Sequence, residues 1–353
     1  MPDPQSLLEV NDLSKSYALR GGFFDRAKGN VQAVDHVSFS IRRGQTFGLV
    51  GESGSGKTTT GRMIVRVVEP DTGKIMFRDE ECGSVDLVKL SSRQIRPVRK
   101  KIQMIFQDPY SSLDPRMTVL RIVGEPLRAT GNISRRATRE RVAEVLEMVG
   151  LRDEYMNRYP HAFSGGQRQR IGIARALATQ PSLIVADEAV SALDVSVQAQ
   201  ILNLLRDLQE RFRLTYLFIA HDLGVVRYLS DTVGVMYSGR LVEIAAKPVL
   251  YSNPKHPYTE SLLAAAPRLE PDTLPIPQPS AQRSSGPRSF SGGCAYFARC
   301  PYRRDVCGRE APPLRQVADG HSVACHFDLT LTNANPPAMG GSKNVQSKGS
   351  AMH

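Results

Sequence analysis

The chain has 353 residues, of which 41% are hydrophobic, and its formal net charge at neutral pH is +11. This length predicts two or three domains with a large core, and the basic charge favours anionic partners such as nucleotides, nucleic acid or lipid headgroups. The N-terminal residues MPDPQSLLEV do not have the pattern of a secretory signal, and no apolar run reaches the roughly 18–20 residues that span a bilayer. We therefore expect a soluble intracellular protein.

Short apolar runs alternate with helical patterns up to about residue 245. Residues 7–10 and 37–41 have strand patterns, and the apolar run 46–50 leads through a Gly-rich loop into a helical pattern over residues 57–68. The ranges that predict buried strands are 101–107, 182–188 and 214–220, and those that predict amphipathic helices are 137–150 and 196–212. Because buried strands that alternate with helices are typical of a parallel sheet covered on both faces, the pattern predicts an α/β fold.

The first motif with a defined chemistry is GESGSGKT, residues 51–58, which lies between a predicted strand and a predicted helix. Its spacing matches G-x-x-x-x-G-K-[ST], a loop whose backbone N–H groups surround the phosphates of a nucleotide. Lys57 is predicted to reach the β- and γ-phosphates, and Thr58 to place its hydroxyl on Mg²⁺. The predicted nucleotide contacts in this stretch are Gly51, Glu52, Ser53, Gly54, Ser55, Gly56, Lys57, Thr58 and Thr59.

Two adjacent carboxylates end the apolar run LIVADE, residues 183–188. Asp187 is predicted to lie in the Mg²⁺ shell, and Glu188 to orient and polarise an attacking water. An acidic pair at a strand end would, on its own, be an ordinary feature. Together with the phosphate loop it predicts nucleotide hydrolysis.

A third motif, FSGGQRQRIGIARALA, occupies residues 163–178. Ser164, Gly165 and Gly166 precede a predicted helix, and a hydroxyl with two glycine amides at a helix N-terminus forms a second anion site. The alternative interpretation of Ser164 is a simple helix cap. Two separate phosphate-binding loops in one chain predict that each meets a nucleotide from a different side.

The set of motifs, in this order over roughly residues 5–245, resembles the nucleotide-binding subunits of ATP-binding-cassette (ABC) transporters. The resemblance implies that Tyr17 stacks on adenine and that Gln107 senses the γ-phosphate and contributes to the Mg²⁺ site. It also implies that Gln167 and Asp194 contact nucleotide and that His221 contacts the γ-phosphate. The residues that it implies for catalysis are Lys57, Gln107, Glu188 and His221.

The resemblance further implies a P-loop NTPase fold with a RecA-like core, an N-terminal antiparallel β subdomain and a helical subdomain at about residues 108–165. We expect this ABC ATPase domain at residues 5–250 and a cysteine-containing extension at residues 251–330. Residues 267–293 are rich in Pro, Ser, Gln and Gly and have the composition of a linker. The polar residues 331–353 are predicted to be a disordered tail.

Several stretches resemble one branch of this family, the ATPases of dipeptide and oligopeptide importers. They are residues 107–127, 157–178, 190–205 and 253–267, the last of which contains HPYT at 256–259. The resemblance implies a second, unlike ATPase subunit, two membrane permeases, an extracytoplasmic solute-binding protein and a place at the cytoplasmic face of the cell membrane. An importer of nickel or another small solute is the alternative. A non-transport ABC ATPase that acts on nucleic acid is a further alternative, although the chain has neither a second cassette nor a long heptad run, so we expect no nucleic-acid partner.

Four cysteines, Cys294, Cys300, Cys307 and Cys325, lie close together late in the sequence. A reducing compartment disfavours disulfides, and the spacing matches neither the usual zinc modules nor the common ferredoxin patterns. The segment resembles the C-terminal extension of peptide-importer ATPases, which implies a [4Fe–4S] cluster bound by these four thiolates. Zinc and plain thiols are the alternatives.

Overall fold

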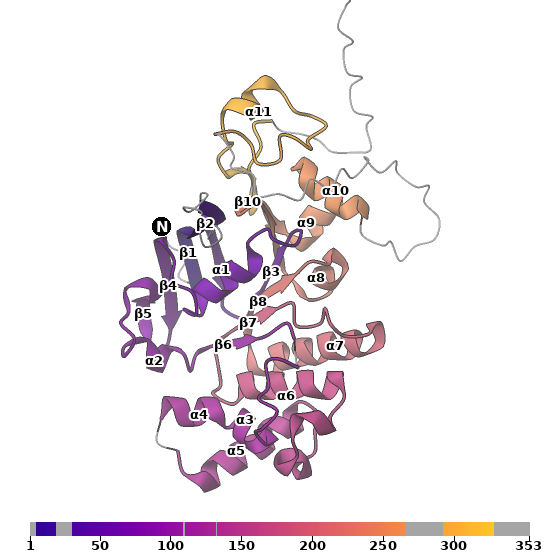
Figure 1. Ribbon diagram of the computed structural model, residues 1–353. Helices are drawn as coiled ribbons and strands as arrows, with labels where there is room; N and C mark the ends of the chain where they lie inside the picture. The colour runs from indigo at the N-terminus through magenta and orange to yellow at the C-terminus, as the bar shows by residue number, and fades with distance from the viewer. Residues whose placement is uncertain (1–4, 19–29, 109, 132, 266–291, 328–353) are drawn as a thin grey trace, which may run out of the picture.

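The computed structural model describes residues 5–18, 30–108, 110–131, 133–265 and 292–327, and these form two sheets with helices packed around them (Figure 1). The predicted disordered tail and almost all of the predicted linker lie outside the described residues. No helix in the described ranges is long and apolar enough to cross a membrane.

The smaller sheet is antiparallel, with strand order β2-β1-β4-β5. In β2, Val37, Phe39 and Ile41 are buried while the residues between them are exposed, which is the alternation expected when one face of a sheet packs on a core. This sheet therefore provides the antiparallel subdomain that the sequence predicted. Its strands are β1(Ser6–Ala18), β2(Asn30–Arg42), β4(Thr72–Asp79) and β5(Gly83–Asp86).

The larger sheet has eight strands in the order β11-β12-β10-β9-β3-β8-β7-β6, and the five strands from β9 to β6 are parallel. Every residue of β3, β7 and β8 is buried, as the continuous apolar runs predicted. The strands are β3(Thr46–Val50), β6(Ile102–Ile105), β7(Leu183–Asp187), β8(Thr215–Ala220), β9(Thr232–Tyr237), β10(Arg240–Ala246), β11(Arg315–Ala318) and β12(His321–Val323).

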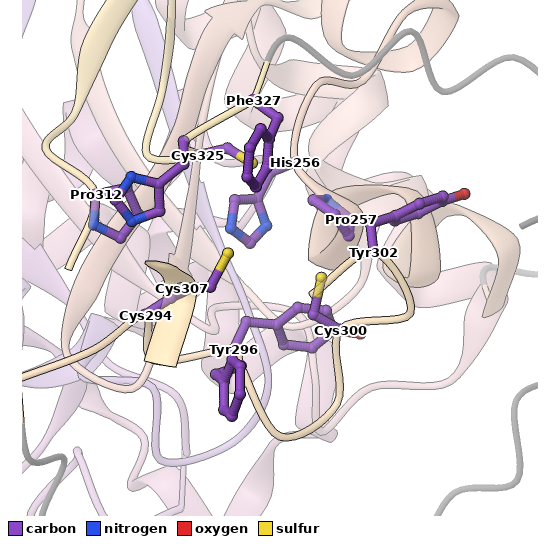
Figure 2. A pocket seen from close by; sticks show the side chains of 12 residues that line it. His256, Pro257, Cys294, Tyr296, Cys300, Tyr302, Cys307, Pro312, Cys325 and Phe327 are labelled. Atoms are coloured by element: carbon purple, nitrogen blue, oxygen red, sulfur yellow. The ribbon is translucent and has the colours of Figure 1, made fainter. Parts of the chain in front are cut away.

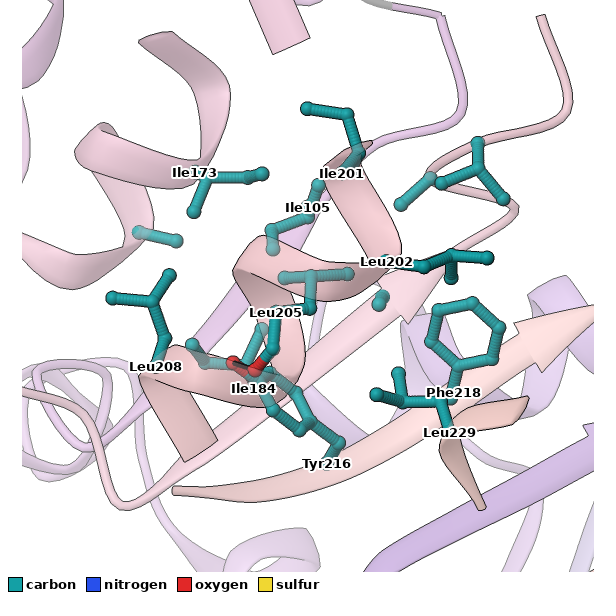
Figure 3. Packing of buried hydrophobic residues seen from close by; sticks show 14 of the residues in the cluster. Ile105, Ile173, Ile184, Ile201, Leu202, Leu205, Leu208, Tyr216, Phe218 and Leu229 are labelled. Carbon is teal, nitrogen blue, oxygen red and sulfur yellow. Dashed lines mark hydrogen bonds between the residues drawn. The ribbon is translucent and has the colours of Figure 1, made fainter. Parts of the chain in front are cut away.

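A separate core covers each face of this sheet, because successive side chains of a strand point to opposite faces. Tyr216 and Phe218 of β8 pack with Leu205 of α7(Val195–Phe212) in one core (Figure 3). Leu217 and Ile219 of the same strand belong to the other core, which contains α1(Lys57–Ile64) and the smaller sheet. Both faces are thus apolar, and the strand ends are the part of the sheet that carries polar chemistry.

The helical region follows β6 and ends with α6. Its longest helix, α5, begins at Arg135, two residues before the predicted range 137–150, and Ser134 caps it, because Ser134 Oγ accepts a hydrogen bond from Ala137 N at 3.1 Å. The helix ends at Met148, shortly before Gly150, which has a φ of 71°. The elements of this region are α3(Val119–Val123), α4(Glu125–Thr130), α5(Arg135–Met148), η2(Asp153–Asn157), η3(Pro160–Ala162) and α6(Gly165–Leu177).

One helix is shorter than its sequence pattern predicts. The pattern extends over residues 57–68, but α1 ends at Ile64 because Arg66 has a left-handed backbone conformation, with a φ of 55°. The remaining short helices are η1(Leu87–Lys89), α2(Ile95–Val98), α8(Leu223–Leu229), α9(Lys247–Ser252), α10(Pro257–Ala265) and α11(Asp305–Arg309).

The cysteine-bearing segment is joined to the larger sheet by main-chain pairing. Strand β12 pairs antiparallel with β10, with Val323 opposite Glu243, and β11 continues the edge. The segment lies at one end of the molecule, next to β10 and near α10 (Figure 1). The division of the chain at residue 250 stays a prediction.

Candidate functional site

The phosphate loop lies between β3 and α1, as predicted. A Cβ atom at Gly51 would lie 2.0 Å from the carbonyl oxygen of Met236, and one at Gly56 would lie 2.2 Å from that of Ala33. Both glycines also have positive φ values, 155° and 100°. Only glycine fits these two positions, so the glycine pattern follows from how closely the loop packs on its neighbours.

Lys57 begins α1 and lies inside this loop, with 4% of its surface exposed. Its Nζ donates to Gly51 O at 2.8 Å, to Glu52 O at 2.9 Å and to Ser55 Oγ at 3.3 Å. Burial lowers the pKa of Lys57, and the nearby carboxylates, Glu188 foremost, oppose that shift. The ammonium group is therefore held at the centre of a ring of oxygen acceptors.

Thr58 and Asp187 form a pair of oxygen ligands beside the loop. Thr58 Oγ1 donates to Asp187 Oδ1 at 2.8 Å, and Asp187 has 2% of its surface exposed. Burial raises the pKa of Asp187, and the hydrogen bond from Thr58 opposes this. A hydroxyl and a carboxylate at a phosphate loop fit Mg²⁺, because this ion prefers oxygen ligands and is bound partly through substrate phosphates. A bound Mg²⁺ would supply charge neutralisation for those phosphates.

The side chains that follow three neighbouring strands come together at Glu188. Gln107 Nε2 donates to Glu188 Oε2 at 2.7 Å, and His221 Nδ1 lies 3.5 Å from the same oxygen. Gln107, Glu188 and His221 follow the neighbouring strands β6, β7 and β8, and ligands of α/β sheets bind at such carboxyl ends. The structure therefore brings Gln107, Glu188 and His221 together in one site. Lys57, the fourth residue expected to carry catalysis, lies on the adjacent phosphate loop.

The third motif, residues 163–178, which we call the signature segment, has its own hydrogen bonds at the start of α6. Ser164 Oγ accepts from Gln167 N at 3.3 Å, and Gln167 Oε1 accepts from Ser164 N at 3.1 Å, so the two residues form a capping box at the start of α6. A Cβ at Gly166 would lie 2.6 Å from Val197 Cγ1, which shows how closely α6 approaches α7. Within the described residues, no hydrogen bond connects this segment to the phosphate loop.

Asp194 and Tyr17 lie on other elements. Asp194 caps α7, accepting from Val197 N at 2.9 Å and from Ser196 Oγ at 2.8 Å, and these hydrogen bonds lower its pKa. Tyr17 lies on β1 with its ring exposed, and Lys15 Nζ is 5.7 Å from the ring centre. Contact of either residue with a nucleotide stays a prediction.

Two residues outside all of these motifs contact the phosphate loop. Glu52 N donates to Tyr258 Oη at 2.8 Å, and Arg299 Nη1 donates to Glu52 Oε2 at 3.0 Å. The sequence marked Tyr258 only as part of HPYT and did not single out Arg299. No local signal could have identified Arg299, because its partner lies 247 residues earlier in the chain.

The four late cysteines line one cavity of about 20 Å³, together with His256 and a mostly apolar set of side chains (Figure 2). None of these four cysteines forms a disulfide bond. Burial raises the pKa of Cys294, and it raises that of Cys300 to about 12. Nevertheless, no three His, Cys, Asp or Glu side chains in the described part of the chain converge in a way that could hold a metal ion.

The buried imidazole of His256 makes stability dependent on pH. Burial lowers its pKa to about 4, and its Nδ1 accepts from Tyr258 N at 3.1 Å. An unfolded histidine has a pKa of about 6.5, so between pH 6.5 and 4 the unfolded chain binds a proton that the folded chain does not. We expect the free energy of unfolding to fall by up to about 3 kcal/mol as the pH drops through this window.

Denaturant unfolding at several pH values between 7.5 and 4 would measure this effect. The matched variant is His256→Gln, which keeps an acceptor for Tyr258 N–H but does not titrate. Its stability is expected to depend less steeply on pH than that of the parent protein over this window. Equal slopes for the two proteins would contradict the assignment to His256.

A parallel sheet with a phosphate loop after β3 and with carboxylates at the end of β7 is the arrangement of a P-loop NTPase. Two family models match the chain: the ABC transporter model over residues 34–191 and the oligopeptide/dipeptide transporter C-terminal region over residues 242–307. The oligopeptide transport ATP-binding protein AppF of Bacillus subtilis (strain 168) is 47% identical over 332 residues, which cover 92% of this chain and 98% of AppF.

Solved structures of ATP-binding cassettes have the same fold. A dimeric ATP-binding cassette in a post-hydrolysis state, bound to ADP and phosphate, has a TM-score of 0.59 and 28% identity, covering 68% of this chain and 98% of that one. A dimeric bacterial ABC transporter cassette has a TM-score of 0.59 and 29% identity, with the same coverage. The chain belongs to the ABC transporter ATP-binding proteins, in their oligopeptide/dipeptide transporter family, and the predicted fold and resemblance are confirmed.

Proposed function

We propose that this ATPase energises the uptake of dipeptides and oligopeptides through a membrane permease. The observation that carries the proposal is the match of residues 242–307 to the C-terminal region of oligopeptide/dipeptide transporters. AppF, which is similar over almost its whole length, is named an oligopeptide transport protein. An importer of nickel or another small solute would use the same ATPase chemistry, so transport itself must be measured.

In the proposed site, Lys57 and the loop amides bind the phosphates while Thr58 and Asp187 hold Mg²⁺. Glu188 takes a proton from the attacking water, which requires a carboxylate within hydrogen-bond reach of the reaction. Gln107 and His221 lie against the same carboxylate oxygen of Glu188. Both side chains are therefore suited to orient that carboxylate and to sense the γ-phosphate.

We propose that the signature segment contacts the nucleotide bound by a partner ATPase. The signature segment and the phosphate loop are not joined by hydrogen bonds in the described residues, and the similar cassettes of known structure are dimers. We propose that Ser164, Gly165, Gly166 and Gln167 meet the nucleotide of an unlike second ATPase subunit. The complex would add two permeases at the cytoplasmic face of the cell membrane and an extracytoplasmic binding protein. ATP hydrolysis would then remove the charge that holds the two ATPases together.

Uptake assays in cells that lack this gene test the transport proposal. The intact gene is expected to restore uptake of a labelled oligopeptide, and a Lys57→Ala gene is expected to fail. Nickel accumulation is measured in the same cells. Restored nickel uptake without peptide uptake would favour the alternative solute, and restoration of neither would exclude both.

We further propose that Cys294, Cys300, Cys307 and Cys325 bind a [4Fe–4S] cluster. Four thiols around one apolar cavity match the ligand set of such a cluster. A bound cluster would act as a structural cross-link and would supply the positive charge that stabilises the buried thiolates.

Metal analysis after anaerobic purification tests this proposal. The protein is expected to contain iron and acid-labile sulfide and to absorb in the visible range, and Cys300→Ser is expected to lose most of both. Cys82→Ser is the matched control, because Cys82 packs with the smaller sheet and not at the cavity. A colourless protein that contains zinc, or no metal, would contradict the cluster.

A further inference from the structure

Glu52 is a phosphate-loop residue whose three polar groups are all engaged. Its carbonyl oxygen accepts from Lys57 Nζ at 2.9 Å. Its N–H donates to Tyr258 Oη at 2.8 Å, and its carboxylate accepts from Arg299 Nη1 at 3.0 Å. One group of Glu52 therefore faces the lysine of the ATP site, and the other two face residues that follow the ATPase core in sequence.

An aromatic cluster fixes the two partners of Glu52. The ring centres of Tyr237, Tyr258 and Tyr296 lie 4.5 to 5.4 Å apart. The Arg299 guanidinium carbon lies 5.7 Å from the Tyr296 ring centre and 6.0 Å from that of Tyr237, within cation–π range. Tyr258 is fully buried. Arg299 thus lies near two rings of the cluster, although its side chain is 40% exposed.

The same cluster connects the loop to the cysteine-lined cavity. Tyr296 lines the cavity, and in the sequence Arg299 stands between Cys294 and Cys300. Arg299 N donates to Tyr296 O at 3.0 Å, so both residues belong to one tight turn of the cysteine segment. A change in the fold of that segment would therefore move the guanidinium relative to Glu52.

The charge of Glu52 is the reason why this contact matters for nucleotide binding. An unpaired carboxylate in a phosphate loop repels the phosphates, and the Arg299 guanidinium offsets that charge. The Glu52 side chain is 44% exposed and that of Arg299 is 40% exposed, so the pair is only partly screened by water.

We propose that Arg299 and Tyr258 are positioning residues of the ATP site, through which the cysteine-bearing extension holds Glu52 and raises the affinity of the phosphate loop for nucleotide. Arg299 neutralises and orients the carboxylate, and Tyr258 fixes the backbone N–H. This goes beyond the structural cross-link proposed above, and it holds whatever fills the cavity.

Calorimetric binding of MgADP and of a non-hydrolysable MgATP analogue to the purified full chain tests the proposal. For an ion pair that is partly exposed, Arg299→Ala is expected to raise the Kd by about threefold to tenfold. Arg299→Lys is expected to restore most of the affinity. Arg303→Ala is the control, because the hydrogen bond and the cation–π contact of Arg303 among the described residues go to Ala298 O and the Phe297 ring of its own segment, and we expect no change.

A double-mutant cycle separates positioning from a general loss of structure. Glu52→Gln in the Arg299→Ala background is expected to recover affinity, since it removes the unpaired charge. Tyr258→Phe, which keeps the buried ring and removes one oxygen atom, is expected to weaken binding by about twofold to fivefold. Wild-type affinity of Arg299→Ala would overturn the proposal, as would a double variant that binds no better than Arg299→Ala.

Discussion

Glu188→Gln is expected to reduce ATP turnover of the assembled complex by about 10²–10⁴-fold, the contribution typical of a positioned general base. The substitution keeps the size of the side chain and an oxygen that can accept from Gln107 Nε2, which now lies 2.7 Å from the carboxylate. It removes the group that can take a proton from water. Lys57, Thr58 and Asp187 are unchanged, so nucleotide binding is expected to persist while hydrolysis stops.

Phosphate release by the complex and nucleotide binding by the purified chain are the two measurements. Glu147→Gln is the matched control, because Glu147 is exposed on α5 far from the strand ends that carry the site. Turnover of Glu188→Gln near that of the control would show that another group, with His221 the nearest candidate, acts as the base.

The sheet and its catalytic edge could be predicted because their signals are local. The strands β3, β7 and β8 are short, mainly apolar runs that are buried throughout. Asp187 and Glu188 stand at the end of β7, His221 follows β8, and β3 leads directly into the phosphate loop. A strand buried on both faces must look like this, since no position faces water. The resemblance of the motif set to ABC ATPases then implied that these side chains act on one nucleotide.

The edge of the sheet formed by the extension could not be predicted in the same way. Strands β11 and β12 have four and three residues, too few to show a period, and the burial pattern of β11 never reaches a fully buried residue. The pairing of β12 with β10, and through β12 the place of β11 at the edge, depends on contacts between segments far apart in sequence. The same holds for the Arg299–Glu52 ion pair, which only the folded chain brings together.

The cysteines show where spacing alone fails. Cys294 and Cys307 are thirteen positions apart, yet Cys294 N donates to Cys307 O at 2.7 Å. A main-chain hydrogen bond thus brings together two cysteines whose sequence spacing does not match the common metal modules. The sequence could therefore identify the four thiols but not the cavity that unites them.

Glu243→Ala is expected to lower the free energy of unfolding by about 3–5 kcal/mol, because it removes the acceptor for three buried or partly buried donors. Glu243 lies on β10 with none of its surface exposed. Its Oε1 accepts from Lys255 N at 2.7 Å and lies 2.8 Å from His321 Nε2, and its Oε2 accepts from His256 N at 2.9 Å. One carboxylate thus ties the start of the HPYT segment and strand β12 to the core sheet.

Denaturant unfolding, with limited proteolysis after residue 250 as a second readout, measures this loss. Glu243→Gln keeps one acceptor oxygen but turns an amide nitrogen toward the remaining donors, so an intermediate loss of unfolding free energy is expected. This variant can be measured even if the alanine variant does not fold. Glu210→Ala, on the exposed face of α7, is the control and is expected to stay within about 0.5 kcal/mol of the parent protein. If Glu243→Ala were as stable as this control, the extension would be held by β10–β12 pairing and the aromatic cluster alone. His256 lines the cysteine cavity, so removal of the Glu243 carboxylate is expected to disturb the packing around that cavity. The disturbance is expected to extend to the phosphate loop through the contact between Arg299 and Glu52.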